Sequence, residues 1–188
     1  MNKEVFIEDV QVYPDAEKRM VKVKVRLSET VSPSSTELSV SAQSFNSSRK
    51  HKVAFKKIAL QKGCREYNFE YSLGSEALMW SDLDPALYRL TVRLKGLDET
   101  SVTFGLRDFR ADGTHFSING TKTFLRGKHD ACVFPLTGYT AMGLDEWRRY
   151  FRICKEYGLN HCRFHSWCPP KACFEAADLE GIYLQPEL

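Results

Sequence analysis

The segment from Gly158 to Leu188, GLNHCRFHSWCPPKACFEAADLEGIYLQPEL, constrains the fold more than any other part of the chain. It predicts a strand at 161–165, a helix that begins at Pro170 and stops at Gly181, and a second strand that leads to Glu187. Strand, helix and strand in this order favour a parallel sheet with right-handed crossovers. Polar residues follow each strand, as they do at the active-site end of a (β/α)8 barrel.

The preceding residues extend this pattern to β-α-β-α-β. Apolar residues recur every three or four positions over 145–157 and predict a helix, with Asp145 as its N-cap. A first strand is expected to end in the stretch Arg126–Asp130, after a β-ribbon with turns at Asp112-Gly113 and Asn119-Gly120. Eight strands in about 250 residues close such a barrel. We therefore expect residues 109–188 to be the truncated N-terminal part of a barrel, with an open sheet edge that invites self-association.

Residues 1–108 show a different periodicity, in which apolar and polar residues alternate. Such alternation occurs at 21–27, 38–42, 67–71 and 88–94. Turn-rich stretches separate these segments, and none of them has a helical pattern. Several short strands in about a hundred residues predict an immunoglobulin-like β-sandwich domain.

Composition excludes several classes of protein. The formal net charge is only +3, and the densest basic stretch, 49–57, alternates with apolar residues as the outer face of a hairpin would. Nucleic-acid binding would require a longer basic surface and a recognisable module. No apolar run approaches the roughly 20 residues that span a membrane, and the N-terminus lacks the apolar core of a signal peptide. The compartment stays open, including a periplasmic or secreted location for a longer parent protein.

Candidate site residues gather where the predicted barrel strands end. Arg163, His165 and Trp167 follow the second strand; the Arg could orient a carboxylate and the Trp could pack against a sugar ring. The alternative is an Arg paired with a neighbouring strand and a Trp that fills the top of the barrel. His129 and Asp130 suggest a substrate-facing rim, against the alternative of a solvated loop.

Glu187 ends the third strand and faces the mouth of the predicted barrel. Most glycosidases need two carboxylates at a defined separation, and only Asp130 is an evident second one. Glu187 is therefore interpreted as a supporting residue rather than as the nucleophile or the acid.

Two His-x-x-Cys pairs leave a zinc site as a further alternative. They are His129 with Cys132 and His165 with Cys168. Structural zinc sites usually lie on knuckle loops, whereas strands already provide the scaffold here, so no metal site is predicted. The six cysteines contain no C-x-x-C motif and are interpreted as free thiols.

Five segments match motifs of glycoside hydrolase family 2, in the order in which the family has them. They are WSDLDPALYRL at 80–90, FGLR at 104–107, FSING at 116–120 followed by LRG at 125–127, GLNHCR at 158–163, and DLEGI at 178–182. The chain therefore resembles this family of β-galactosidases, β-glucuronidases and β-mannosidases. It differs at Asp82, where the family often has Pro, and at 164–169, where many members have Ser-His-Tyr-Pro. The His that family β-galactosidases carry after R-G-x-x-R has no counterpart, although His129 stands nearby.

The resemblance implies an internal fragment of a retaining exo-β-glycosidase, with a β-galactosidase-like activity as the first candidate. Both catalytic glutamates would lie beyond Leu188 and a sugar-binding jelly roll before residue 1, so this chain is expected to be inactive alone. It implies a carbohydrate partner and no cofactor, although a divalent cation in the parent is compatible with it. The supporting or substrate-binding residues would be His129, Asp130, Arg163, His165, Trp167 and Glu187. The rival hypothesis is a non-catalytic carbohydrate-binding or interaction module.

Overall fold

The computed structural model describes residues 5–32 and 36–187, and the chain divides into two compact units. The first consists of Met1–Met79 and Ala86–Asp108, and the second of Trp80–Pro85 and Phe109–Leu188. Each unit has a hydrophobic core of its own. Within the described residues, neither helix combines the length and the apolar character that a membrane span requires.

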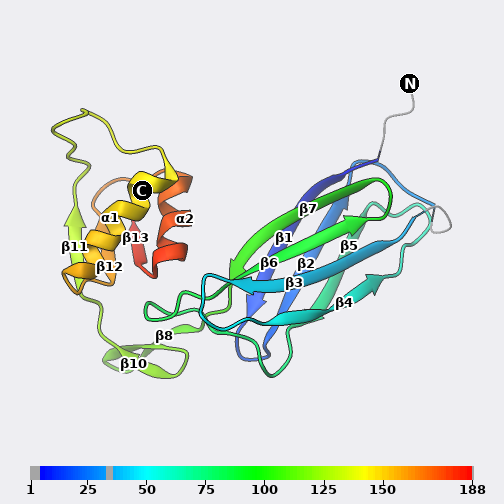
Figure 1. The fold of residues 1–188 in the computed structure, drawn as a ribbon, viewed down its shortest axis with the longest axis horizontal. Helices are drawn as coiled ribbons and strands as arrows, with labels where there is room; N and C mark the ends of the chain where they lie inside the picture. The colour runs from blue at the N-terminus through cyan, green and yellow to red at the C-terminus, as the bar shows by residue number, and fades with distance from the viewer. Residues whose placement is uncertain (1–4, 33–35, 188) are drawn as a thin grey trace. The chain divides into compact units, whose positions relative to one another are not determined.

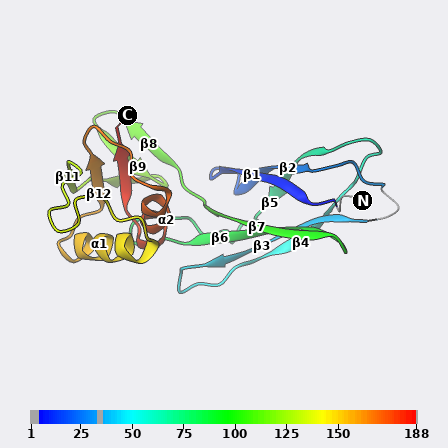
Figure 2. The ribbon, with the colours of Figure 1, turned by 90° about the horizontal axis from the view of Figure 1, so that it is seen from above.

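The first unit is a sandwich of two antiparallel sheets, which Figure 2 shows as two layers. One sheet has the order β1–β2–β5 and the other β4–β3–β6–β7. The strands are β1 (Ile7–Asp15), β2 (Met20–Leu27), β3 (Leu38–Phe45), β4 (Lys52–Ile58), β5 (Glu66–Ser72), β6 (Leu87–Leu94) and β7 (Asp98–Gly105). On β2, apolar residues at alternate positions are buried and the Lys and Arg residues between them are exposed. The predicted immunoglobulin-like sandwich is confirmed.

The second unit contains a parallel three-stranded sheet of order β11–β12–β13. Its elements are β11 (Gly127–Asp130), α1 (Leu144–Glu156), β12 (His161–Phe164), α2 (Lys171–Glu180) and β13 (Tyr183–Pro186). Both helices pack on one face of this sheet (Figure 1). Trp147, Phe151, Phe164 and Cys173 belong to the core of this unit. The described residues thus form two successive β/α crossovers and no closed barrel.

A small antiparallel ribbon precedes the parallel sheet. It consists of β8 (Phe109–Asp112), β9 (His115–Ile118) and β10 (Thr121–Thr123). Both predicted turns are present, and Asn119 and Gly120 each have a positive φ, as a two-residue hairpin of the type I′ class requires.

Two boundaries differ from those predicted. Arg126–Asp130 was expected to contain only the end of the first strand, but the whole strand is Gly127–Asp130. Adjacent side chains therefore point to opposite faces of the sheet, which separates His129 from Asp130. The N-cap of helix α1 lies two residues earlier than predicted: it is Gly143, whose N–H donates to the Glu146 carboxylate at 3.0 Å. Asp145 lies in the first turn instead, where its charge complements the helix dipole.

The loop Trp80–Pro85 lies between β5 and β6 in the sequence but belongs to the second unit. The Asp82 carboxylate accepts hydrogen bonds from Asn160 Nδ2 and from the Tyr183 hydroxyl, each at 3.0 Å. Lys155 Nζ donates to the backbone carbonyl of Asp82. Asn160 is only 2% exposed, so these bonds satisfy a side chain that burial alone would destabilise. The loop thus anchors the start of β12 and β13.

Candidate functional site at the carboxyl ends of the parallel strands

The face of the parallel sheet that the helices leave uncovered carries a row of polar residues. His129 of β11, Arg163 of β12 and Gln185 of β13 are register partners. Their neighbours Cys162 and Phe164 point to the other face and are fully buried under the helices. In a parallel sheet covered by helices on one side, the uncovered face is where a barrel would have its interior.

Arg163 and His165 converge on Glu187 just beyond this row. Arg163 Nε and Nη2 both lie 2.7 Å from Glu187 Oε1. His165 Nδ1 lies 3.1 Å from Oε2, and the Ser166 N–H donates to the same oxygen at 2.9 Å. Ser166 has a φ of 60°, an uncommon conformation for a residue with a side chain, and it aims this N–H at the carboxylate. We call Arg163, His165 and Glu187 the rim cluster.

These donors fix the charge of Glu187. The Ser166 N–H and the Arg163 guanidinium lower the pKa of Glu187 to about 2, because each favours the ionised form. A general acid that works near neutral pH needs a raised pKa. Glu187 therefore remains a carboxylate whose two oxygens are both engaged, which suits a residue that holds Arg163 and His165 in place.

The rim cluster is open to solvent and is extended by His129. The side chains of Arg163 and His165 are 43% and 48% exposed, respectively. The imidazole of His129 lies against that of His165, with 5.0 Å between the ring centroids. The cluster thus offers exposed imidazole and guanidinium groups at the end of the uncovered face, next to the row of polar residues.

Asp130 does not join the rim cluster. Its side chain is 8% exposed and lies on the helix-covered side of β11, where Oδ2 accepts from the Tyr150 hydroxyl of α1 at 2.6 Å. Oδ1 accepts from the Cys132 N–H at 3.0 Å. Burial, and then the bond to Asp130, raise the pKa of Tyr150, so the phenol stays a donor. Asp130 anchors the turn after β11 and does not line the uncovered face.

Trp167 likewise packs toward the core. Its indole makes edge-on contacts with Phe164, at 5.1 Å between centroids, and with Phe134, at 6.2 Å. Its Nε1 donates to the backbone carbonyl of Asp130 at 3.3 Å. Trp167 thus packs against the core that the helices cover, and its contact with a sugar stays a prediction.

The two His-x-x-Cys pairs are not part of a larger group of metal-binding side chains among the described residues. No group of three or more His, Cys, Asp or Glu side chains within residues 5–32 and 36–187 has an arrangement that could hold an ion. All six cysteines are free. Cys132 and Cys168 are exposed, whereas Cys154, Cys162 and Cys173 are buried.

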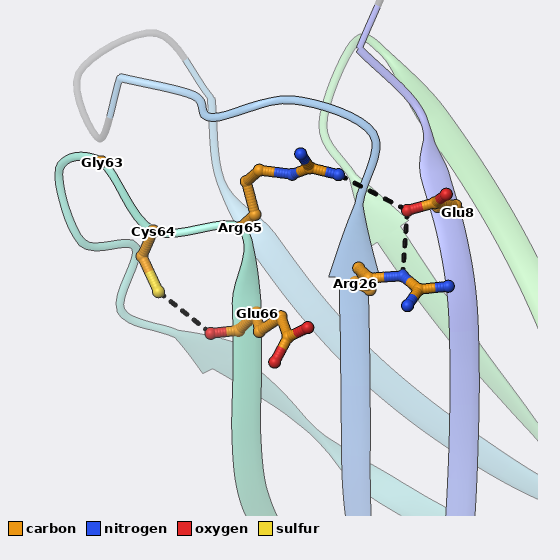
Figure 3. A pocket seen from close by; sticks show the side chains of 6 residues that line it. All are labelled: Glu8, Arg26, Gly63, Cys64, Arg65 and Glu66. Atoms are coloured by element: carbon orange, nitrogen blue, oxygen red, sulfur yellow. Dashed lines mark hydrogen bonds and ion pairs between the residues drawn. The ribbon is translucent and has the colours of Figure 1, made fainter.

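The first unit has a cavity of about 600 Å³ at one end of the sheet β1–β2–β5. Figure 3 shows that Glu8 lies between Arg26 and Arg65. Glu8 Oε2 is 2.9 Å from Arg26 Nε and 3.6 Å from Arg65 Nη2. Gly63, Cys64 and Glu66 complete the lining. Because two arginines face two glutamates, the charges of this cavity are balanced within the protein, and it has no excess charge to attract a charged ligand.

Sequence reasoning missed one residue of the uncovered face, Gln185, and one partner of Asp130 on the other face, Tyr150. Gln185 lies in register with Arg163, and the alternation along β13, in which Gln185 and Glu187 share a face, could have indicated it. Tyr150 was recognised only as an apolar position of α1, because the helical period does not reveal that its hydroxyl reaches Asp130.

An immunoglobulin-like sandwich followed by parallel strands with helices on one face defines a chain with two types of domain. Residues 5–107 match the model of the glycosyl hydrolases family 2, a span of more than half of the 188-residue chain. The chain belongs to that family.

A curated relative is the beta-galactosidase BgaC of Bifidobacterium adolescentis, which is 27% identical over 113 residues. That alignment covers 57% of this chain and 11% of the relative. The chain therefore corresponds to a small part of the length of that protein.

Solved structures resemble nearly the whole chain. They include a Faecalibacterium prausnitzii beta-glucuronidase (20% identity, TM-score 0.74, 97% of this chain and 28% of that one). A Parabacteroides merdae beta-glucuronidase has 22% identity and a TM-score of 0.70, and the match covers 96% of this chain and 24% of that one. A family 2 beta-galacturonidase from Eisenbergiella tayi has 21% identity and a TM-score of 0.67, with 97% of this chain and 32% of that one covered. At these identities the likeness establishes the fold alone.

Proposed function

We propose that residues 109–188 are the first β/α units of the (β/α)8 catalytic domain of a retaining exo-β-glycosidase. The observation that carries the proposal is the rim cluster, in which Arg163, His165 and Glu187 meet at the carboxyl end of parallel strands. This end is where barrel enzymes bind their substrates. The sandwich before it and the family membership support the same assignment.

In this proposal the rim cluster positions groups and does not cleave the bond. Glu187 holds Arg163 through two nitrogens at 2.7 Å, and Arg163 in turn orients the carboxylate that acts as the nucleophile. His129, His165 and Gln185 face the sugar. Retaining enzymes need a nucleophile and an acid about 5–5.5 Å apart. Neither Asp130 nor Glu187 suits these roles, because the hydrogen bonds described above engage the oxygens of both.

A terminal β-galactoside is the first candidate substrate, since the relative from Bifidobacterium adolescentis is a beta-galactosidase. The solved beta-glucuronidases and the beta-galacturonidase make uronides the competing class. The chemistry proposed here requires no cofactor, although a divalent cation in the complete enzyme is compatible with it.

The test uses the natural protein that contains this chain and a panel of 4-nitrophenyl β-glycosides. We expect the highest kcat/KM on the galactoside, with the β-anomer as the first product by proton NMR. Preference for the glucuronide or the galacturonide would contradict the galactosidase assignment but not the enzyme class. An α-anomer as first product would contradict retention.

Residues 1–188 as a separate chain should hydrolyse none of these substrates. If the chain alone hydrolyses one of them, and substitution of a residue within the chain abolishes that rate, the catalytic carboxylates lie within it and the proposal fails.

A further inference from the structure

The outer face of the sheet β4–β3–β6–β7 has a groove of about 330 Å³ with an unusual charge distribution. Lys50, Lys52 and Arg89 line it together with neutral residues, and its lining includes no Asp or Glu. Its volume lies at the lower end of the ~300–1,000 Å³ range of small-molecule sites. The remaining lining residues are Ser41, Ala42, Gln43, Ser44, Phe45 and Thr91.

The cations of this groove lack the carboxylate partners that two other cations of the same sheet have. Arg93, four residues along β6 from Arg89, pairs with Glu99 at 2.5 Å, and Lys57 of β4 pairs with Glu37 at 2.6 Å. The register partners of Arg89 are Gln43 on β3 and Thr103 on β7, both uncharged. Within residues 5–32 and 36–187, Lys50, Lys52 and Arg89 form no ion pair. The positive charge of the groove is therefore available to a ligand.

Arg89 is held in a defined position. Its guanidinium lies over the ring of Phe45, 5.2 Å from the ring centroid. A cation held against an aromatic face keeps the edge of its planar fork free for a carboxylate. A donor that is already ordered loses less conformational entropy when it binds.

The neutral lining suits hydroxyl groups. Gln43 lies between Lys52 and Arg89 in the register, so a carboxamide sits between two cations. Ser41 and Thr91 are partners in the next row and carry hydroxyls, of which that of Thr91 also bonds to the Ser101 hydroxyl at 2.9 Å. A sugar acid offers a carboxylate, several hydroxyls and an apolar C–H face on one small molecule. Inorganic phosphate would match only the cations.

We propose that this groove is an accessory binding site for an anionic saccharide, such as a uronic-acid unit, in which Arg89 binds the carboxylate and Lys50 and Lys52 add to the attraction. The site goes beyond the proposed glycosidase function, since it belongs to the sandwich and needs no catalytic residue. Binding is electrostatic in part and weakens as salt screens the exposed charges.

The test is a calorimetric titration of the full chain with trigalacturonate, with neutral galactotriose as the matched sugar. We expect trigalacturonate to bind at least tenfold more tightly, and to lose several-fold in affinity when NaCl rises from about 50 to about 500 mM. Arg89→Gln should weaken trigalacturonate binding about tenfold. Arg89→Lys, which keeps the charge but not the fork, should fall in between.

Arg93→Gln is the matched control, because Arg93 lies on the same strand and face but is paired with Glu99. It should change the affinity less than twofold. Lys52→Gln provides a second variant of the groove in case Arg89→Gln unfolds. Thermal denaturation checks that both variants are folded. Three results would overturn the proposal. They are equal affinity for the two trisaccharides, a loss of affinity in Arg93→Gln as large as that in Arg89→Gln, and displacement of trigalacturonate by equimolar phosphate or a single-stranded oligonucleotide. The last two results would identify a general anion surface.

Discussion

Gly181 provides the sharpest test of how the second unit is held together. It ends α2 with a φ of +74°, and a Cβ placed there would lie 2.7 Å from the backbone oxygen of Asp82. Gly158 follows α1 with a nearly identical φ of +75°, but a Cβ there would meet nothing within 4 Å. Gly158→Ala therefore measures the conformational strain alone, whereas Gly181→Ala adds displacement of the loop Trp80–Pro85.

The expected magnitudes follow from these contacts. An alanine in the left-handed region costs about 1–2 kcal/mol. Displacement of Asp82 would in addition weaken its bonds to Lys155 and Tyr183, each worth about 0.5–1.5 kcal/mol. We expect Gly158→Ala to lower the free energy of unfolding by about 1 kcal/mol and Gly181→Ala by about 3 kcal/mol.

Urea unfolding followed by tryptophan emission can isolate the second unit. The three tryptophans of the chain, Trp80, Trp147 and Trp167, all belong to it. Emission therefore reports on this unit without interference from the sandwich. If the two alanine variants are equally stable, the loop does not anchor the unit and the reasoning is refuted.

Three further predictions concern the candidate site. Glu187 has a pKa of about 2 in the folded chain, below its ordinary value of ~4.3, so its contribution to stability is complete above about pH 4.3 and is lost as the pH falls toward 2. Denaturation at a series of pH values should therefore show a free energy of unfolding that depends less on pH in Glu187→Gln. An unchanged pH dependence would contradict the assignment. Tyr150→Phe removes a donor to the buried Asp130 carboxylate and should destabilise the second unit by about 1–3 kcal/mol in urea, whereas a neutral effect would mean that water replaces the hydroxyl. A thiol reagent should modify two cysteines of the folded chain rapidly and three only after unfolding, because burial both shields these three thiols and raises their pKa. Fast reaction of a buried thiol would contradict the packing. The fast pair is Cys132 and Cys168, and the protected ones are Cys154, Cys162 and Cys173.

Periodicity was sufficient to predict most of the fold. The alternation along 21–27 and 88–94 directly reflects burial of every second residue, and the helical period of 145–157 identified the buried face of α1. The short strand β11 was harder, because four residues, Gly127 to Asp130, are too few for an alternation to stand out among charged neighbours. The stretch was interpreted as the polar end of a strand, where neighbouring side chains need not alternate, and this is why Asp130 was placed with His129.

Long-range partners could not be predicted from local pattern. The ion pair of Arg163 with Glu187 joins residues 24 positions apart, and the bond of Asp82 to Tyr183 joins residues 101 apart. Only the register of the parallel strands and the docking of the loop bring these atoms together. The sequence indicated that Arg163, His165 and Glu187 stand at strand ends, but not that they share hydrogen bonds.

The most direct test of the central claim is the kinetic effect of Arg163→Lys on β-glycoside hydrolysis by the natural protein. A lysine keeps the charge but loses the two-nitrogen contact with Glu187, so the nucleophile would be less well oriented. We expect kcat to fall about 100-fold with little change in KM. Arg152→Lys, an exposed position on α1 that pairs with Glu180, is the matched control and should retain full activity. The account would be contradicted if the kcat of Arg163→Lys lay within about threefold of that of the unsubstituted protein, which is a difference in activation free energy of only ~0.7 kcal/mol.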